Sequence, residues 1–216
     1  AVKVLEEVND SEASTIHRTI YGLSHISGDI ESGRYKHIFA LKNNSTDSDD
    51  HIYFIDESSM ISDLYSNSET ISFGSGNLLF DLLAYTAIHD KNTARKIVFI
   101  GDTFQLPPIK SLLSPALDAN YLRSKYHLNV VDCRLNEVVR QSNNSTILEN
   151  ANLLRDENNQ DYFRDINFEI KEDVRLCEAA DMTDRYIDSI SRYKSNIIIA
   201  QTNNSVHNYN YMVRHK

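Results

Sequence analysis

The sequence predicts an α/β fold built around a parallel sheet, and two features of its apolar pattern carry this prediction. Short runs rich in β-branched and aromatic residues are continuous instead of alternating, as expected for strands that are covered on both faces. Stretches with helical spacing lie between these runs, and strands that alternate with helices indicate α/β architecture. The 216 residues, 41% hydrophobic and 25% charged, suit one large globular domain or one domain and part of a second.

The first quarter of the chain contains few strong signals. Residues 1–8 have helical spacing without a preceding cap, so the chain is expected to begin inside a helix. Ser14 is the expected cap of a second, short amphipathic helix within 12–23. Residues 34–41 are expected to be extended, and the polar, turn-rich residues 42–50 are expected to form a loop.

The remaining elements follow in alternation. The expected strands are 52–55, 96–100, 129–133 and 196–200, and the expected helices are 77–90, 114–126, 145–156 and 181–193. The polar stretch 156–175 fits either a linker or an edge hairpin.

Composition and charge argue against several classes of protein: membrane-spanning, secreted and disulfide-rich proteins. No run approaches the roughly 18 apolar residues of a membrane span, and the first residues show no signal-peptide layout. Cys133 and Cys177 lie far apart, so we expect neither a disulfide framework nor a metal cluster, and a reducing cytoplasm is the expected location. The net charge of −9 argues mildly against nucleic acid as a partner, because basic surface supplies most non-specific affinity. Many nucleic-acid motors nevertheless concentrate positive charge in one groove and are acidic elsewhere.

Two of the predicted strands end on acidic residues. Asp56 and Glu57 follow 52–55, and Gly101 and Asp102 follow the next strand. Ligands of open α/β sheets gather at the carboxyl ends of the strands. A single Asp there commonly caps the next helix or turn, but an adjacent pair is the pattern by which nucleoside-triphosphate hydrolases hold Mg²⁺ and activate water. Mg²⁺ needs few protein carboxylates, because it keeps several waters and binds phosphate oxygens.

The loop after the second strand, "GDTFQLPPI", strengthens this interpretation. Gly101 permits a backbone turn, and Pro107 and Pro108 stiffen the loop that positions Gln105. A rigidly held glutamine is suited to hydrogen-bonding a phosphate or the attacking water. The alternative is a proline-stiffened loop with a surface glutamine.

These stretches together resemble superfamily 1 DNA helicases of the RecD/Dda-like branch. "IYFIDESSM" followed by "FIGDTFQLPPI" resembles motifs II and III of that family, and "EASTIH" is similar to a segment that precedes motif II. "LNEVVRQS" and "ILENANLLRD" resemble motif IV and the helix after it, and "IIIAQTNNSVHNYNYMVR" is similar to the strand and helix that open the second half. The matches occur in the family's order and cover nearly the whole chain, and motif III is the most specific of them.

The resemblance implies a RecA-like parallel sheet flanked by helices, a partial P-loop NTPase fold, over residues 1–134. It implies the start of a second RecA-like domain over residues 135–216. It also implies ATP and Mg²⁺ as ligands, with Asp56 as the metal ligand, Glu57 as the general base that orients the hydrolytic water, and Gln105 as the sensor of the γ-phosphate.

Further residues acquire roles from the resemblance. Arg140 would reach across from the second domain as an arginine finger, or would be a surface arginine of a solvated helix. Asp102 is expected to fix the motif III loop instead of contacting nucleotide. Thr15 and His17 would face DNA or pack against the core, and Asn203 would contact DNA or cap the last helix.

The sequence departs from the family at the phosphate-binding loop. No G-x-x-x-x-G-K-[ST] occurs, and the glycine-rich "GSGN" at 74–77 lacks the lysine and follows motif II. The chain also stops before the family's last motifs, so we expect a central piece of a longer helicase that hydrolyses ATP poorly by itself.

The implied function is ATP-dependent translocation on single-stranded DNA and unwinding at duplex junctions. The parent would be a free-standing helicase or the motor of an exonuclease complex, with nuclease, replication or repair proteins as partners and no membrane. A non-catalytic DNA-binding or interaction module that retains the helicase scaffold is the alternative. An unrelated P-loop ATPase that shares only the acidic pair leaves "GDTFQLPPI" unexplained.

Overall fold

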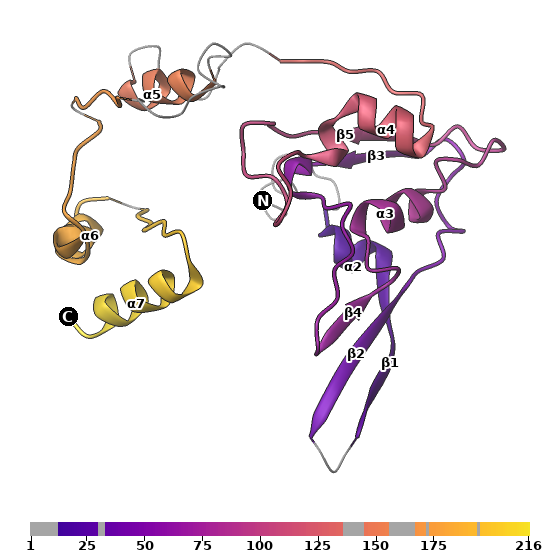
Figure 1. Ribbon diagram of the computed structural model, residues 1–216, viewed down its shortest axis with the longest axis horizontal. Helices are drawn as coiled ribbons and strands as arrows, with labels where there is room; N and C mark the ends of the chain where they lie inside the picture. Colours follow the sequence, from indigo (N-terminus) through magenta and orange to yellow (C-terminus); the bar gives the residue numbers. More distant parts are fainter. Residues whose placement is uncertain (1–12, 30–32, 136–144, 156–166, 172, 194) are drawn as a thin grey trace. The chain divides into compact units, whose positions relative to one another are not determined.

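The computed structural model describes residues 13–29, 33–135, 145–155, 167–171, 173–193 and 195–216. The chain divides into two compact units, Ala1–Leu135 and Asn136–Lys216. The architecture is mixed α/β, with two small open sheets that each contain a parallel strand pair (Figure 1). The α/β class expected from the apolar pattern is therefore confirmed. The expected helix at 1–8 lies outside the described residues.

The first unit begins with the short helix α2 (Ile16–Ile20). The Thr15 hydroxyl accepts a hydrogen bond from the Arg18 backbone N–H at 3.4 Å, so Thr15 is the N-cap and the prediction of Ser14 is wrong by one residue. The helix ends at Tyr21, where the backbone becomes extended. The predicted helix over 12–23 is therefore shorter than its apolar spacing suggested.

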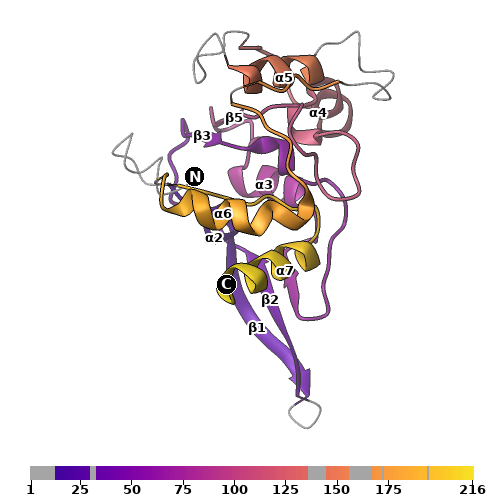
Figure 2. The ribbon, with the colours of Figure 1, turned by 90° about the vertical axis from the view of Figure 1, so that its left-hand side faces the viewer.

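A long hairpin follows directly. Strand β1 (Tyr21–Asp29) pairs antiparallel with β2 (Arg34–Leu41), with an irregularity in register between Leu23 and His25. The hairpin projects beyond the helices of this unit in both views (Figures 1 and 2). The extended conformation expected for 34–41 is confirmed, whereas β1 was not predicted.

The short strand β4 (Ile71–Phe73) pairs parallel with β2. The glycine-rich stretch after it forms the turn into the next helix, with Gly74 at φ 42° and Gly76 at φ 83°. A Cβ on Gly74 would lie 2.2 Å from Asp81 Oδ2, so this position combines a left-handed backbone with a close approach. The glycines of 74–77 thus shape a tight turn.

The second sheet contains two of the predicted strands. Strand β3 (Ile52–Ile55) pairs parallel with β5 (Lys96–Phe99) in the register Ile55↔Phe99. One face packs on the core, but Phe54 is 67% exposed and Val98 is 38% exposed on the other. The expectation that both faces are covered is wrong for the described residues, because the helices of this unit pack on one side of the sheet.

Two helices cover that side. Helix α3 (Leu78–Thr86) is capped by Asn77, whose side chain accepts from Phe80 N at 3.0 Å. The 3₁₀ helices η1 (Ser58–Met60) and η2 (Pro115–Leu117) are short, and η2 leads into α4 (Ala119–Tyr126). Both α-helices fall within the predicted ranges 77–90 and 114–126, and both end at a residue in the left-handed conformation.

The core of the first unit is centred on α3. Its buried apolar side chains come from α2, β1, η1, α3, η2 and α4 and the residues beside them: Ile20, Tyr21, Ile61, Leu79, Leu82, Leu83, Ala116 and Leu122. Partly buried side chains of β3 and β5, including Ile55 and Phe99, pack against this cluster. The predicted strand 129–133 is not a strand in the structure.

Arg95 fixes the loop predicted at 42–50. Its guanidinium donates to the carbonyl oxygens of Asp47 at 2.6 Å and Ser48 at 3.1 Å. The Tyr53 hydroxyl donates to Asp47 Oδ2 at 2.7 Å, and burial together with this carboxylate raises the pKa of Tyr53 to about 12. The loop is therefore polar in sequence but tied to the body of the unit.

The second unit contains helices α5 (Thr146–Arg155), α6 (Met182–Ile190) and α7 (Asn203–Arg214), and the short 3₁₀ helix η5 (Ala179–Asp181). The helices expected at 145–156 and 181–193 are thus confirmed, whereas 196–200 pairs as a strand with none of the described residues. The stretch 156–175 lies partly outside the described residues. Across the described parts of the chain, no helix has the length and apolarity of a membrane span.

Candidate functional site

The acidic pair lies in the turn that follows β3. Both side chains are exposed, and the Glu57 backbone N–H donates to Asp56 Oδ1 at 2.9 Å. Glu57 has φ 53° and ψ 39°, a left-handed conformation that costs a non-glycine residue about 1–2 kcal/mol. Such a conformation persists only where the surrounding structure enforces it. The two carboxylates are therefore held on a constrained turn.

Two buried serines follow the acidic pair, and the first of them holds the turn. Ser58 and Ser59 are both 0% exposed. The Ser58 hydroxyl donates to the Ile55 carbonyl at 2.7 Å, and the Ser58 N–H donates to the Ile100 carbonyl at 2.9 Å. The Ile100 N–H in turn donates to the Ile55 carbonyl at 2.8 Å. These bonds bring the turn after β3 against the residues that follow β5.

Gly101 lies at the point of closest approach. A Cβ on this residue would lie 2.9 Å from Leu117 Cδ1, 3.1 Å from Ser59 N and 3.2 Å from Ser58 N. These separations are shorter than ordinary contacts, so the absence of a side chain allows the two turns to pack. Gly101 was expected to permit a backbone turn, and in the structure its lack of a side chain also allows this close packing.

The loop after Gly101 carries Gln105. The Asp102 carboxylate accepts from the Phe104 N–H at 3.0 Å, and the Asp102 carbonyl accepts from the Gln105 N–H at 3.0 Å. These bonds close a turn that Asp102 organises. The Gln105 side chain is exposed, and Pro108 is buried farther along the loop.

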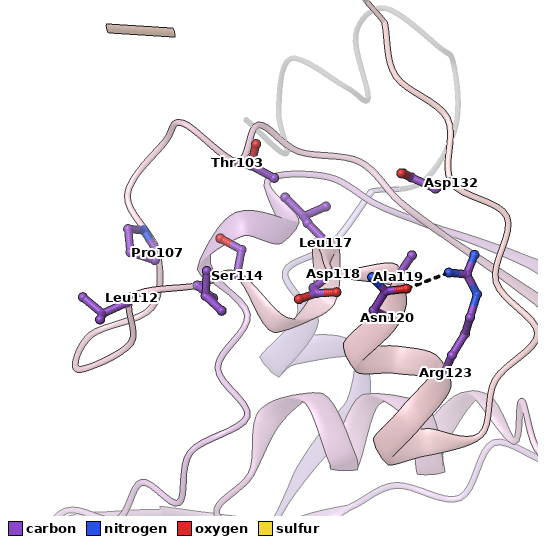
Figure 3. A pocket seen from close by; sticks show the side chains of 11 residues that line it. Thr103, Pro107, Leu112, Ser114, Leu117, Asp118, Ala119, Asn120, Arg123 and Asp132 are labelled. Carbon is purple, nitrogen blue, oxygen red and sulfur yellow. Dashed lines mark hydrogen bonds between the residues drawn. The ribbon is translucent and has the colours of Figure 1, made fainter. Parts of the chain in front are cut away.

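A cleft of about 350 Å³ lies beside this loop (Figure 3). Arg123 donates to Asn120 Oδ1 at 3.2 Å and to the Val130 carbonyl at 2.7 Å on its far side. The cleft is lined by residues of this loop, η2, α4 and the chain after α4: Thr103, Pro107, Leu112, Leu113, Ser114, Leu117, Asp118, Ala119, Asn120, Arg123 and Asp132. Asp56, Glu57 and Gln105 are not part of the lining. The acidic pair and Gln105 therefore lie on the open end of the sheet and not in this cleft.

The acidic pair can contribute to a magnesium site. Among the described residues, no three His, Cys, Asp or Glu side chains gather into a metal-binding group. Mg²⁺ takes one or two protein carboxylates when phosphate oxygens and water complete its shell. One oxygen of Asp56 accepts from Glu57 N, which leaves the other for a ligand. The exposed pair thus fits a cation bound jointly with a phosphate.

The other candidate residues are distributed as follows. Arg140 lies outside the described residues. His17 packs edge-on against Phe73 with ring centroids 4.8 Å apart, and burial lowers its pKa. Asn203 is the first residue of α7, but Thr202 is the N-cap and accepts from Ser205 N at 3.1 Å, so the capping interpretation of Asn203 is wrong.

Comparison of the chain with protein-family models, with curated proteins and with solved structures gives no match.

Proposed function

We propose that this chain is the central segment of an ATP-dependent DNA helicase, which couples ATP hydrolysis to movement along single-stranded DNA and to duplex unwinding. The observation that carries the proposal is the hydrogen bond from Ser58 N to the Ile100 carbonyl, because it joins the acidic turn to the Gly-Asp-x-x-Gln loop. A metal-binding carboxylate, a second carboxylate and a glutamine beside one another are the groups that a nucleoside triphosphatase needs around a γ-phosphate.

The fold of the first unit supports this assignment. Its parallel pair β3 and β5 places both functional turns at the carboxyl ends of adjacent strands, where α/β proteins bind ligands. We therefore assign residues 1–134 to a RecA-like domain and residues 135–216 to the start of a second one.

Each candidate residue then has a chemical task. Asp56 would hold Mg²⁺, which when bound supplies positive charge to the phosphate oxygens of ATP. Glu57 would orient the attacking water and accept its proton, and its exposed side chain is accessible to water. The Gln105 amide would hydrogen-bond the γ-phosphate. Arg140 would supply a positive charge for the transferring phosphoryl group.

DNA is the proposed partner of the surface around these turns. A strand would be held by backbone contacts and base stacking, with closure of the two domains on ATP and opening after hydrolysis producing movement. The parent protein would act alone or as the motor of a nuclease, replication or repair complex.

The decisive test is ATP hydrolysis by the full-length gene product with Mg²⁺ and single-stranded DNA. Glu57→Gln should reduce kcat by about 10²–10⁴-fold, the usual contribution of a general base, and leave ATP affinity unchanged. Arg140→Ala should slow hydrolysis far more than it weakens ATP binding. Glu69→Gln, a change to an exposed glutamate of the same unit, is the matched control and should retain the wild-type rate.

Each other outcome has a definite meaning. Wild-type turnover in Glu57→Gln would exclude the general-base role. DNA binding without hydrolysis would favour a non-catalytic module on the same scaffold. Binding of neither ATP nor DNA by the full-length protein would overturn the proposal.

A further inference from the structure

A buried carboxylate lies six residues beyond the acidic turn and has no place in the mechanism described above. The Asp63 side chain is 3% exposed. It accepts hydrogen bonds from Tyr121 Oη at 2.5 Å, from Tyr126 Oη at 2.5 Å and from Lys125 Nζ at 2.7 Å. All three donors belong to α4. A charge so far removed from water requires partners of this kind, and Asp63 has three.

The backbone of Asp63 joins a third element. Its carbonyl accepts from Asn77 Nδ2 at 3.0 Å, and Asn77 is the cap of α3. Asp63 therefore connects the segment after the acidic turn to the beginning of α3 and to both the first and the last turn of α4. Ile61, 3% exposed, anchors the same segment in the core.

The segment that leads into α4 also contacts Gly101, at the start of the loop that carries Gln105. Leu117, in the 3₁₀ turn η2 that leads into α4, is the nearest side chain to Gly101. The Gly101 backbone packs on the amides of Ser58 and Ser59. Asp63 follows the acidic turn along the chain and contacts α4. Leu117, just before α4, contacts Gly101, and Gly101 packs against the acidic turn. The acidic turn and the Gln105 loop are therefore linked both directly and through α4.

We propose that Asp63 is a positioning residue of the ATP site. It fixes the turn that carries Asp56 and Glu57 relative to the loop that carries Gln105. The role rests on the proposed function, because it concerns the geometry of that site. Removing the Asp63 charge weakens the hydrogen bonds that join α4 to the segment after the acidic turn, while the hydrogen bond from Ser58 N to the Ile100 carbonyl remains. Catalytic groups displaced by about 1 Å can lose about 10²-fold in rate.

The chemistry of the cluster is consistent with a permanent anchor. Although burial opposes ionisation, the hydrogen bonds from Lys125, Tyr121 and Tyr126 hold the pKa of Asp63 below its usual range. The hydrogen bonds that Lys125 makes to Asp63 and to Tyr121 raise the pKa of Lys125. Lys125 Nζ also lies 5.3 Å and 5.5 Å from the ring centroids of the two tyrosines. The carboxylate and the ammonium therefore stay charged together around neutral pH.

The test compares Asp63→Asn with Asp81→Asn. Asp81 is a second buried carboxylate of the same unit, 2% exposed, which accepts from Tyr21 Oη at 2.6 Å and from Ser75 N at 3.0 Å near the base of the hairpin. Both substitutions should lower the unfolding temperature. Only Asp63→Asn should shift or broaden the amide NMR signals of Ser58, Ser59 and Gly101 in the 216-residue chain.

Kinetics supply the second readout. In the full-length protein, Asp63→Asn should lower kcat by about 10- to 100-fold with KM for ATP unchanged, whereas Asp81→Asn should keep the wild-type kcat per folded molecule. If Asp63→Asn does not fold, Tyr126→Phe removes a single hydrogen bond of the cluster and is compared in the same way.

Two results would overturn the inference. One is an Asp63→Asn protein whose three amide signals stay in place, and the other is a folded variant with the wild-type kcat. A wild-type protein that hydrolyses no ATP would instead refute the proposed function, and the NMR comparison would still decide whether Asp63 holds the turn.

Discussion

Gly101→Ala is the most direct test of the packing between the turn that carries Asp56 and Glu57 and the loop that carries Gln105. The added methyl would meet the backbone nitrogens of Ser59 at 3.1 Å and Ser58 at 3.2 Å, and Leu117 Cδ1 at 2.9 Å. The leucine methyl can rotate away, but both serines are buried and the Ser58 N–H is hydrogen-bonded to the Ile100 carbonyl, so the serine backbone cannot move in the same way. Overpacking of a well-packed site costs about 1–3 kcal/mol, and we expect about 1–2 kcal/mol here because one of the three contacts can relax.

This loss converts into a measurable change in melting temperature. An unfolding entropy of about 2.1 cal/mol/K per residue, applied to the first unit, Ala1–Leu135, predicts a decrease of roughly 4–7 °C. Calorimetry of the 216-residue chain measures it directly.

Gly22→Ala is the matched control for this experiment. A Cβ on Gly22 would lie 3.5 Å from Lys42 Cγ, an ordinary contact, so this variant should be no less stable than the wild type. If the Gly101→Ala and Gly22→Ala proteins have the same melting temperature, the close approach of the two turns is refuted.

Two further predictions concern stability. Hydrogen bonds from Thr146 and from the Ile147 N–H lower the pKa of Asp173 to about 2. The ionised carboxylate therefore stabilises the fold fully above the ordinary value of 3.8, and this stabilisation is lost as the pH falls toward 2. The amide NMR signal of Ile147 should shift over this pH range, and Asp173→Asn should abolish that shift. Arg95→Met should cost about 1–3 kcal/mol, because the Asp47 carbonyl loses its 2.6 Å partner, and faster hydrogen exchange confined to 42–50 would verify it. Unchanged exchange there would show that the guanidinium does not hold the loop.

The elements that could be predicted from sequence are those whose signals are local. The runs 52–55 and 96–99 are strands because β-branched and aromatic side chains suit an extended backbone, and the structure pairs them in parallel. The helical ranges around α3, α4, α5 and α6 were also predicted, since apolar spacing and capping residues act within one or two turns of a helix.

The candidate site was predictable in the same local sense. Asp56 and Glu57 directly follow a strand, and Gln105 follows the next one within a few residues. Their roles as metal ligand, base and phosphate sensor stay predictions, as does that of Arg140. Ser58 and Ser59 were missed as structural residues, because the sequence offers only two small polar side chains after the acids.

Tertiary structure decided everything that depends on a partner distant in sequence. Strand β1 has mixed small and polar residues and becomes a strand by pairing with β2, whereas 129–133 has strand-forming residues but is not a strand. A strand needs hydrogen bonds from a neighbour, and no local pattern states whether that neighbour is present.

The need for a partner distant in sequence also explains why Asp56 and Glu57 could be singled out from the sequence and Asp63 could not. From sequence alone, Asp56 and Glu57 stand out because they adjoin each other and end a strand, whereas Asp63 resembles any polar residue of a loop. The three donors of Asp63 lie 58 to 63 residues away on α4, and this distance in sequence is closed only by folding. The sequence by itself determined the two strands and the acidic and glutamine residues that follow them, because these signals are local. The folded chain decided which buried groups hold them there, because burial and hydrogen bonding are properties of contacts between distant segments.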